Sequence, residues 1–278
     1  MTDPLTHFLA ARAVPGIEAV DGGEYRRTVR LPHGPAIVGL GRASGGEEVA
    51  DRRDDADDAV VAADRRDEAA ARAALVRLAG ADPSPADARL GGDRLLGPLI
   101  AARPGLRMPG TVDGGELAVR AVLGQQVSLA AARTLAGRLV AAAGEPLPEP
   151  SGTLTHVWPA PEAIAEVAPR MPMPRSRQRA LAALARALAD GLRLDPPADP
   201  DEVRTALLEL PGIGPWTAEY VAMRALGDPD AWLPTDLGVR HGLARLGASV
   251  GDADAWRPYR AHAVRHLWAA AAGRAPGG

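Results

Sequence analysis

Residues 208–236 read LELPGIGPWTAEYVAMRALGDPDAWLPTD, and their order predicts two helices joined by a tight corner. An apolar segment leads into Pro211-Gly212-Ile213-Gly214, and Pro215 stands where a second helix would begin. Glycine permits tight dihedral angles and close approach of a partner, and proline suits the first turn of a helix. Free amides at the start of the second helix would point toward an anion.

The corner differs from the common nucleotide-binding loops. A helix rather than a strand precedes it, the third glycine of a dinucleotide fingerprint is missing, and there is no Gly-Lys-Ser/Thr as in a P-loop. A helix–hairpin–helix that grips one backbone phosphate of DNA is therefore the better interpretation. A plain tight turn between two helices is the alternative.

Aromatic side chains are few and gather near this corner. The chain holds nine, and six of them lie between Trp216 and Trp268. Trp216 and Tyr220 are four positions apart, so they share one face of the helix that follows the corner. Ordinary core packing would explain any one of them. Their concentration beside a phosphate-binding corner favours a stacking pocket for a planar ligand such as a flipped base.

Asp236 ends the quoted stretch, directly after Pro234 and Thr235. Either Thr235 or Asp236 suits the N-cap of the next helix, and that structural role alone would account for the aspartate. A carboxylate at this helix start could also face the sugar of a flipped nucleotide. The two roles are compatible.

Composition narrows the class of protein. Apolar residues make up 46% of the 278, enough for a substantial core, and the net charge is −3. There is no apolar run of membrane-spanning length and no signal-peptide pattern, so we expect a cytoplasmic protein. Cysteine is absent, and all 32 basic residues are arginine. Disulfides, cysteine-ligated iron–sulfur clusters and a side-chain Schiff base are therefore excluded.

The pattern of secondary structure changes near residue 90. Short strands are predicted first, followed by one alanine-rich helix, in the segments 24–31, 35–42, 58–63 and 66–80. Helical patterns joined by Pro- and Gly-rich segments such as 144–152 follow, in 115–144, 175–191, 199–210 and 257–273. The expected fold class is α+β, with a small antiparallel-sheet domain over 1–90 and a helical domain over 91–278.

Several segments together resemble a known superfamily. LPGIGPWTAEYVAMRALGDPDAWLPTDLGVR (210–240) is similar to the helix–hairpin–helix, Gly/Pro-rich loop and aspartate of one DNA glycosylase superfamily. FLAARAV (8–14), AARPGLRMPGTVDGGELAVRAVLGQQVS (101–128) and WRPYRAHAVRHLW (256–268) resemble its bacterial DNA-3-methyladenine glycosylase II branch. The similarity covers nearly the whole chain and implies a small sheet domain followed by a two-lobed helical body.

The resemblance implies roles for single residues. Asp236 matches the catalytic aspartate of the family. Four aromatic residues match its base pocket: Trp216, Tyr220, Trp268 and, from the N-terminal domain, Phe8. Three residues match its DNA-binding hairpin: Gly212, Ile213 and Gly214. No cofactor is required, although the carbonyls of Leu208, Leu210 and Ile213 match ligands of a structural Na⁺ or K⁺.

Two features depart from the family pattern. Gln126 falls where some members place a leucine wedge that fills the gap left by the flipped base. A polar wedge is plausible there, so Gln126 is also expected to contact DNA. The acidic stretch 46–68 is also unlike the family.

The implied chemistry is hydrolysis at an alkylated purine in double-stranded DNA. Such a base is cationic, so it leaves readily and stacks well on electron-rich rings. Asp236 would place negative charge near C1′ and orient or deprotonate the attacking water. Lyase-active relatives carry a lysine just after the hairpin, where this chain has Trp216. We therefore expect a monofunctional glycosylase that leaves an intact abasic site. The resemblance to the family also implies a monomer.

Two other groups of residues allow competing interpretations. His262 and His266 are four positions apart on the last helix, a spacing that suits a metal ion, but no third ligand is evident and packing histidines are favoured. Arg175, Arg177 and Arg179 stand at a helix start, where they either meet phosphates or form a solvated helix end.

Two rival functions stay open at this point. A non-catalytic helix–hairpin–helix module would bind DNA without chemistry, but the presence of Asp236 with the aromatic set argues against it. A glycosylase for deaminated or oxidised bases is the other rival. A pocket of aromatic rings with no evident hydrogen-bonding groups for a base edge favours cationic bases instead.

Overall fold

The structure, a computed structural model, describes residues 3–40, 58–62 and 64–273, with the backbone alone for 58–62. Most of the acidic stretch 46–68 therefore lies outside the described residues. Contacts divide the chain into two compact units. The first comprises Met1–Leu78, Gly115–Arg193 and Leu210–Gly212, and the second comprises Ala79–Gly114, Leu194–Glu209 and Ile213–Gly278.

These units are discontinuous in sequence, unlike the expected domains 1–90 and 91–278. The expected boundary marks the change from strand to helix patterns, which a sequence can reveal. The units instead follow contacts, because the chain leaves the sheet-bearing unit near residue 79 and returns to it near residue 115. The domain assignment itself stays a prediction.

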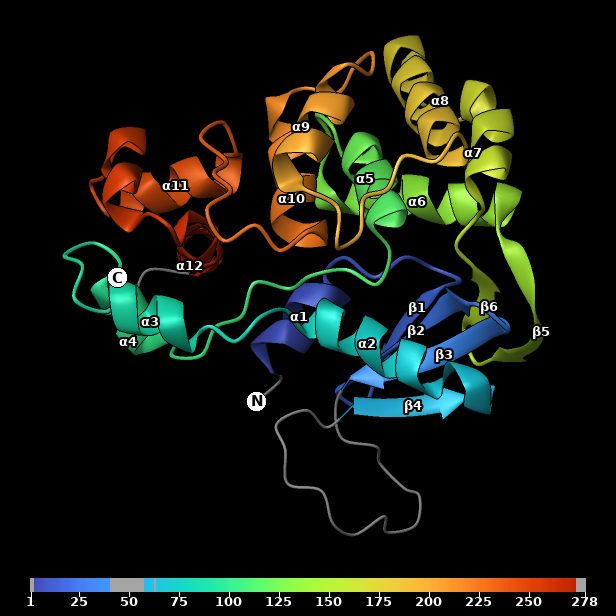
Figure 1. Ribbon diagram of the computed structural model, residues 1–278, viewed down its shortest axis with the longest axis horizontal. Helices are drawn as coiled ribbons and strands as arrows, with labels where there is room; N and C mark the ends of the chain where they lie inside the picture. The colour runs from blue at the N-terminus through green and yellow to red at the C-terminus, as the bar shows by residue number, and fades with distance from the viewer. Residues whose placement is uncertain (1–2, 41–57, 63, 274–278) are drawn as a thin grey trace, which may run out of the picture. The chain divides into compact units, whose positions relative to one another are not determined.

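The first unit contains the antiparallel sheet expected from the sequence. Its strands pair in chain order: β1 (Glu18–Asp21), β2 (Glu24–Leu31), β3 (Gly34–Leu40) and β4 (Asp58–Ala62). Figure 1 shows them in blue. The predicted strands at 24–31, 35–42 and 58–63 correspond to β2, β3 and β4. The sequence did not reveal β1, because four residues are too few for a visible alternation.

One predicted joint is a strand. Segment 144–152 was expected to connect helices, but β5 (Glu145–Ser151) pairs there with β6 (Leu154–Val157). Its three prolines stand at alternate positions, and proline is tolerated on an edge strand. The hairpin joins the sheet, since Thr28 Oγ1 donates to the carbonyl of His156 over 2.8 Å.

Helices complete the first unit: α1 (Pro4–Ala10), α2 (Glu68–Ala79), α5 (Gly114–Leu123), α6 (Leu129–Ala143), α7 (Pro161–Val167) and α8 (Arg175–Ala189). Two short 3₁₀ turns lie at Arg65–Asp67 and Ala168–Arg170. The helical pattern over 115–144 forms two helices, α5 and α6, because the chain turns after Leu123 and Ser128 caps the new helix. The predicted helices at 66–80 and 175–191 are confirmed as α2 and α8.

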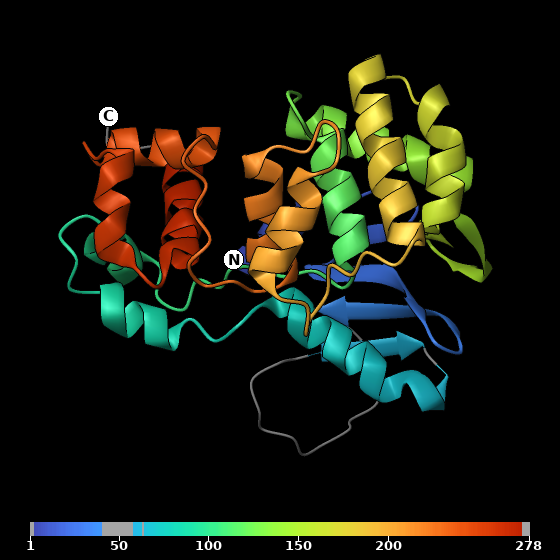
Figure 2. The same ribbon diagram turned by 45° about the horizontal axis from the view of Figure 1, so that its top comes forward.

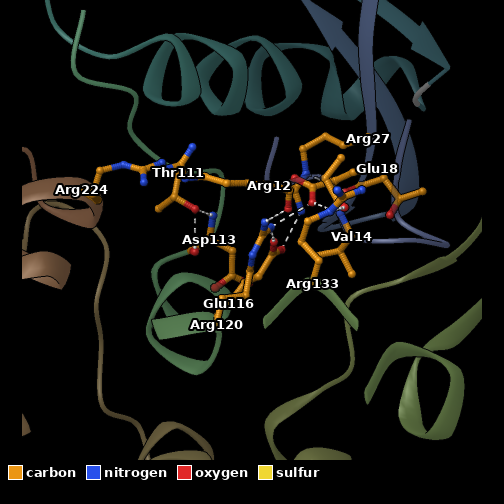
Figure 3. Close-up of polar contacts among 12 residues, drawn as sticks. Arg12, Val14, Glu18, Arg27, Thr111, Asp113, Glu116, Arg120, Arg133 and Arg224 are labelled. Atoms are coloured by element: carbon orange, nitrogen blue, oxygen red, sulfur yellow. Dashed lines mark hydrogen bonds and ion pairs between the residues drawn. The ribbon is translucent and has the colours of Figure 1, made fainter. Parts of the chain in front are cut away.

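A buried group of charges ties the sheet to α5 (Figure 3). Arg27 of β2 donates to Glu116 of α5 over 2.6 Å, and Arg120 of α5 donates to Glu18 over 3.0 Å and to Glu116 over 2.8 Å. Tyr25 also donates to Glu18. Burial alone would raise the pKa of Glu18, but Arg120 and Arg27 outweigh it and hold this pKa below its ordinary value of 4.5.

The second unit consists of helices: α3 (Ser84–Leu90), α4 (Gly97–Ala102), α9 (Pro200–Leu208), α10 (Pro215–Ala225), α11 (Leu237–Arg245) and α12 (Arg260–Ala272), with a 3₁₀ segment at Val250–Trp256. As predicted, Asp199 caps α9 and Pro200 begins it. Figure 2 shows α11 and α12 side by side, in orange-red. Fully buried Trp256, Leu233 and Leu267 contribute to the core of this unit.

The described elements confirm the α+β class, with a small antiparallel sheet in the N-terminal part and, apart from the pair β5–β6, helices through the rest. None of the helices in the described part of the chain is both long and apolar enough to span a membrane.

Candidate active site

The predicted hairpin joins α9 to α10. Gly212 takes a φ of +80°, which favours glycine, and Gly214 and Pro215 provide the N-cap and first residue of α10. A Cβ atom added to Gly212 would lie 2.7 Å from Cβ of Ala180 in α8. The corner therefore needs glycine at position 212 for both its backbone angle and its close approach to a helix.

An ion-pair network holds α9 against α10. The guanidinium of Arg204 donates two 3.0 Å hydrogen bonds to the carboxylate of Glu219, a bidentate arrangement, and also donates to Asp228. These two carboxylates raise the pKa of Arg204 despite its partial burial. Because Arg204 belongs to α9 and Glu219 to α10, the network fixes the two helices that flank the hairpin.

The turn between α5 and α6 carries the predicted wedge. Gln126 is exposed and takes a φ of +56°, a left-handed conformation that costs a non-glycine residue energy. Its neighbour Gln125 donates from Nε2 to the carbonyl of Gly212 over 3.0 Å. Gln125 thus links this turn to the hairpin, a role that sequence reasoning missed because the two segments lie 87 positions apart.

Three of the four predicted pocket aromatics come together in the second unit. Trp216 and Tyr220 stack with ring centroids 5.1 Å apart and planes 11° apart, as their spacing on one helix predicted. Tyr220 also faces Trp268 of α12, with centroids 6.4 Å apart and a tilt of 48°. All three are only partly buried against the core, so this aromatic group keeps an accessible surface that could receive a planar ligand.

Asp236 lies between two of these aromatic residues. Nε1 of Trp216 donates to Oδ2 over 3.1 Å, and Nε1 of Trp268 donates to Oδ1 over 2.8 Å. The backbone N–H of Val239 also donates to Oδ1 over 2.9 Å, which makes Asp236 the N-cap of α11. The capping role predicted for this aspartate is confirmed, and the same side chain accepts hydrogen bonds from two of the rings predicted to line a base pocket.

The close fit at this carboxylate depends on a glycine that follows it. A Cβ atom on Gly238 would lie 2.7 Å from Cδ1 of Trp268 and 3.1 Å from Oδ1 of Asp236. Any larger residue would push the indole away from the position in which it donates to Asp236. No local sequence pattern indicates this contact, because Trp268 lies 32 residues beyond Asp236.

Arg224 fixes the orientation of Tyr220 and was not expected from the sequence. Its buried guanidinium donates to the hydroxyl oxygen of Tyr220 over 2.7 Å, and it also donates to the carbonyls of Pro109 and Gly110. The tyrosine hydroxyl therefore accepts from Arg224, and its own proton points elsewhere. Arg224 stands four residues after Tyr220 on α10, a spacing that could have suggested the pair.

Phe8, the remaining predicted pocket residue, belongs to the first unit. Its side chain is buried in α1, and the guanidinium carbon of Arg12 lies 3.6 Å from the ring centroid. Arg12 also donates to the carbonyl of Phe8 over 3.1 Å. Membership of Phe8 in a base pocket stays a prediction.

The three arginines at the start of α8 have different roles. Arg177 donates to the carbonyl of Leu123 at the end of α5, although the 3.3 Å distance is long. Arg175 and Arg179 are exposed and could meet phosphates.

The site combines an acceptor with aromatic walls. The Asp236 carboxylate accepts hydrogen bonds from two indole N–H groups and one backbone N–H, so it presents negative charge at a fixed place. The two indoles that donate to it are also planar surfaces for stacking. Such an arrangement can bind a flat, electron-poor ring and stabilise positive charge that develops beside it.

Comparisons with known proteins place the chain among related sequences. The AlkA N-terminal domain family matches residues 1–113. The chain is 47% identical over 270 residues to the probable bifunctional transcriptional activator/DNA repair enzyme AlkA of Mycobacterium tuberculosis, covering 94% of this chain and 53% of that protein. It is 38% identical over 180 residues to DNA-3-methyladenine glycosylase 2 of Escherichia coli, covering 62% of this chain and 63% of the relative.

The fold matches solved structures as well. The 3-methyladenine DNA-glycosylase from Archaeoglobus fulgidus superposes with a TM-score of 0.78 and 22% identity, covering 96% of this chain and 93% of that one. The chain spans about half the length of the M. tuberculosis relative and less than two thirds of the E. coli one. The chain thus carries an AlkA N-terminal domain over residues 1–113 and is similar in sequence to proteins named AlkA and DNA-3-methyladenine glycosylase 2.

Proposed function

We propose that this chain is a DNA glycosylase that flips alkylated purines such as 3-methyladenine out of double-stranded DNA and hydrolyses their N-glycosidic bonds. The observation that carries the proposal is the placement of Asp236, whose two carboxylate oxygens each accept a hydrogen bond from an indole of the aromatic group. The binding surface and the negative charge are thus fixed to each other.

The aromatic group suits a cationic base. Alkylation at N3 or N7 gives a purine a positive charge, and a cation over a desolvated indole or phenol gains about 2 kcal/mol. Trp216, Tyr220 and Trp268 supply such faces. The charge also makes the base a good leaving group, so the reaction needs no strong general acid.

Asp236 would act on the sugar and the water. As the bond from C1′ to the base nitrogen breaks, its electron pair leaves with the base, and positive charge develops at C1′. The carboxylate stabilises that charge and orients the water whose oxygen then bonds to C1′. The proton lost by the water passes to the carboxylate and on to solvent, and the products are a free base and an abasic site.

We infer that the enzyme lacks lyase activity. Cleavage of the strand by a lyase proceeds through a Schiff base with an amine, and the chain contains no lysine. The position just after the hairpin is Trp216, which stacks on Tyr220.

The hairpin and the turn near Gln126 would hold the DNA. Gly212, Ile213 and Gly214 would present amides to a backbone phosphate. The carbonyls of Leu208, Leu210 and Ile213 are neutral oxygen donors of the kind that suits a Na⁺ or K⁺ ion, while Gln125 engages the carbonyl of Gly212. Gln126 would fill the space left by the flipped base, and its exposure at a turn supports this role. We expect the enzyme to act as a monomer.

Release of bases from defined duplexes tests the proposal. The purified protein should release free 3-methyladenine from methylated duplex DNA, and it should release less base from duplexes that contain uracil or 8-oxoguanine. Borohydride treatment during the reaction should trap no covalent complex with DNA. Binding without release of any base would favour the non-catalytic module, and preferred release of a neutral base would favour the other rival.

A further inference from the structure

Two histidines on α12 and an aspartate on α3 bring their side-chain ends together inside the second unit. His262 and His266 stand four residues apart and are 7% and 1% exposed. The third residue, missing from the sequence pattern, is Asp87, which lies 175 positions before His262. One nitrogen of each ring and one carboxylate oxygen all lie within 4.8 Å of one another.

The distances show which atoms converge. Nε2 of His262 is 2.7 Å from Oδ1 of Asp87 and 3.2 Å from Nε2 of His266. The rings are inclined by 66°, so they are not stacked face to face. Oδ2 of Asp87 accepts the backbone N–H of Gly105 over 3.0 Å, which orients the carboxylate and leaves Oδ1 toward the histidines.

Without a metal ion, neither placement of the protons on the two histidines gives every polar atom of this cluster a favourable partner. If Nε2 of His262 carries the proton and donates to Asp87, Nε2 of His266 presents a lone pair, so its proton sits on Nδ1. That atom is buried and has no hydrogen-bond partner among the described residues, an arrangement that costs about 1–3 kcal/mol. If Nε2 of His266 carries the proton instead, the lone pair on Nε2 of His262 faces the carboxylate at 2.7 Å, which is repulsive.

A divalent cation would accept the lone pairs of the three converging atoms and remove the choice of which Nε2 carries the proton. The N–H at Nδ1 of His266 would stay as it is, without a partner among the described residues. Each lone pair would then point at positive charge, and three coordinate bonds would replace one shared hydrogen bond. Ligands about 2.0–2.1 Å from a tetrahedral zinc ion are roughly 3.3 Å apart. The 3.2 Å between the two Nε2 atoms already fits. The contact between Nε2 of His262 and Oδ1 of Asp87 would need to open from 2.7 Å to roughly 3.3 Å.

We propose that Asp87, His262 and His266 form a binding site for one divalent first-row transition metal ion, with zinc the best match. Two imidazoles and one carboxylate are ligands that zinc favours. The three protein ligands leave a fourth position for water, and the Asp87 side chain, 19% exposed, gives access from solvent.

The bound ion would join α3 to α12. His266 lies two residues before Trp268, whose indole donates to Asp236. The metal would therefore brace the helix that presents one wall of the aromatic group. It would take no part in the chemistry at Asp236, so the site stands whether or not the proposed glycosylase function is correct.

Metal analysis of the untagged full chain tests the proposal. After incubation with Zn²⁺ and exhaustive dialysis, mass spectrometry of the metal content should find about one zinc per chain, and Co²⁺ should give the visible absorption of a coordinated ion. Added Zn²⁺ should raise the melting temperature.

Substitutions locate the ion. His262→Gln and Asp87→Asn should each weaken zinc binding by about tenfold or more, since even outer-shell partners contribute about 10–100-fold. His241→Gln, which alters an exposed histidine on α11, should bind as wild type does. If His262→Gln does not fold, zinc binding by Asp87→Asn and the Co²⁺ spectrum of the wild type still test whether the cluster binds the ion. Absence of stoichiometric zinc, or equal binding by wild type and Asp87→Asn, would overturn the proposal.

Discussion

Replacing Glu116 with glutamine should cost the first unit much of its stability. Glu116 is 2% exposed and accepts hydrogen bonds from two guanidinium groups, those of Arg27 at 2.6 Å and Arg120 at 2.8 Å. Glutamine keeps the shape but removes the charge. Arg27, itself almost fully buried, would then share the single carboxylate of Glu18 with Arg120.

The magnitude follows from what is lost. Each hydrogen bond between charged groups contributes about 1.5–3 kcal/mol. Breaking a buried ion pair by removing one partner costs about 3–5 kcal/mol, because the other charge stays buried. The chain offers a matched control in the same unit: Arg30 and Glu145 also pair at 2.6 Å, but their side chains are 47% and 54% exposed. Glu145→Gln should cost no more than about 1 kcal/mol.

Urea unfolding followed by far-ultraviolet circular dichroism would measure both variants. Because two units need not unfold together, hydrogen–deuterium exchange of peptides from β2 and α5 should locate the loss in the first unit. A loss below about 1 kcal/mol for Glu116→Gln, or equal losses for the two variants, would refute the reasoning that burial makes this ion pair important.

Three further predictions concern pH and two glycines. Because the pKa of Glu18 is lowered on folding, its contribution to stability is present above pH 4.5 and is lost as the pH falls below that value. Below pH 4.5, the melting temperature of Glu18→Gln should therefore depend less on pH than that of wild type. Gly238→Ala should slow base release roughly tenfold to a hundredfold by displacing Trp268, while the melting temperature changes little. Gly212→Ala should destabilise the hairpin by about 1–2 kcal/mol or more and weaken DNA binding measured by fluorescence anisotropy. Gly214→Ala, with a φ of −107° and open space for a Cβ atom, should do neither.

Local patterns predicted the elements whose formation depends on neighbouring residues. Alternation indicated β2, and Asp199 with Pro200 marked the start of α9. Proline misled at β5, because the rule against proline in strands applies where its missing N–H would be needed, and an edge strand leaves that side free. The split between α5 and α6 was not foreseen, since apolar periodicity continues across the turn.

In the candidate site, too, local patterns predicted the contacts between neighbouring residues but not those between distant segments. The stacking of Trp216 on Tyr220 follows from helical spacing, and the capping role of Asp236 follows from its place before a helix. Contacts between distant segments give no such signal. The bond from Trp268 to Asp236 and the approach of Asp87 to His262 depend on how whole helices pack, which short patterns do not encode.

Single-turnover release of 3-methyladenine by Asp236→Asn tests the central claim most directly. Asparagine caps helices as well as aspartate does, so the fold and DNA binding should persist. The account predicts that the variant binds methylated duplex DNA with near wild-type affinity and releases the base at least about a hundredfold more slowly, because it lacks the negative charge beside C1′. Release at a rate close to that of wild type would contradict the assignment of Asp236 as the catalytic group.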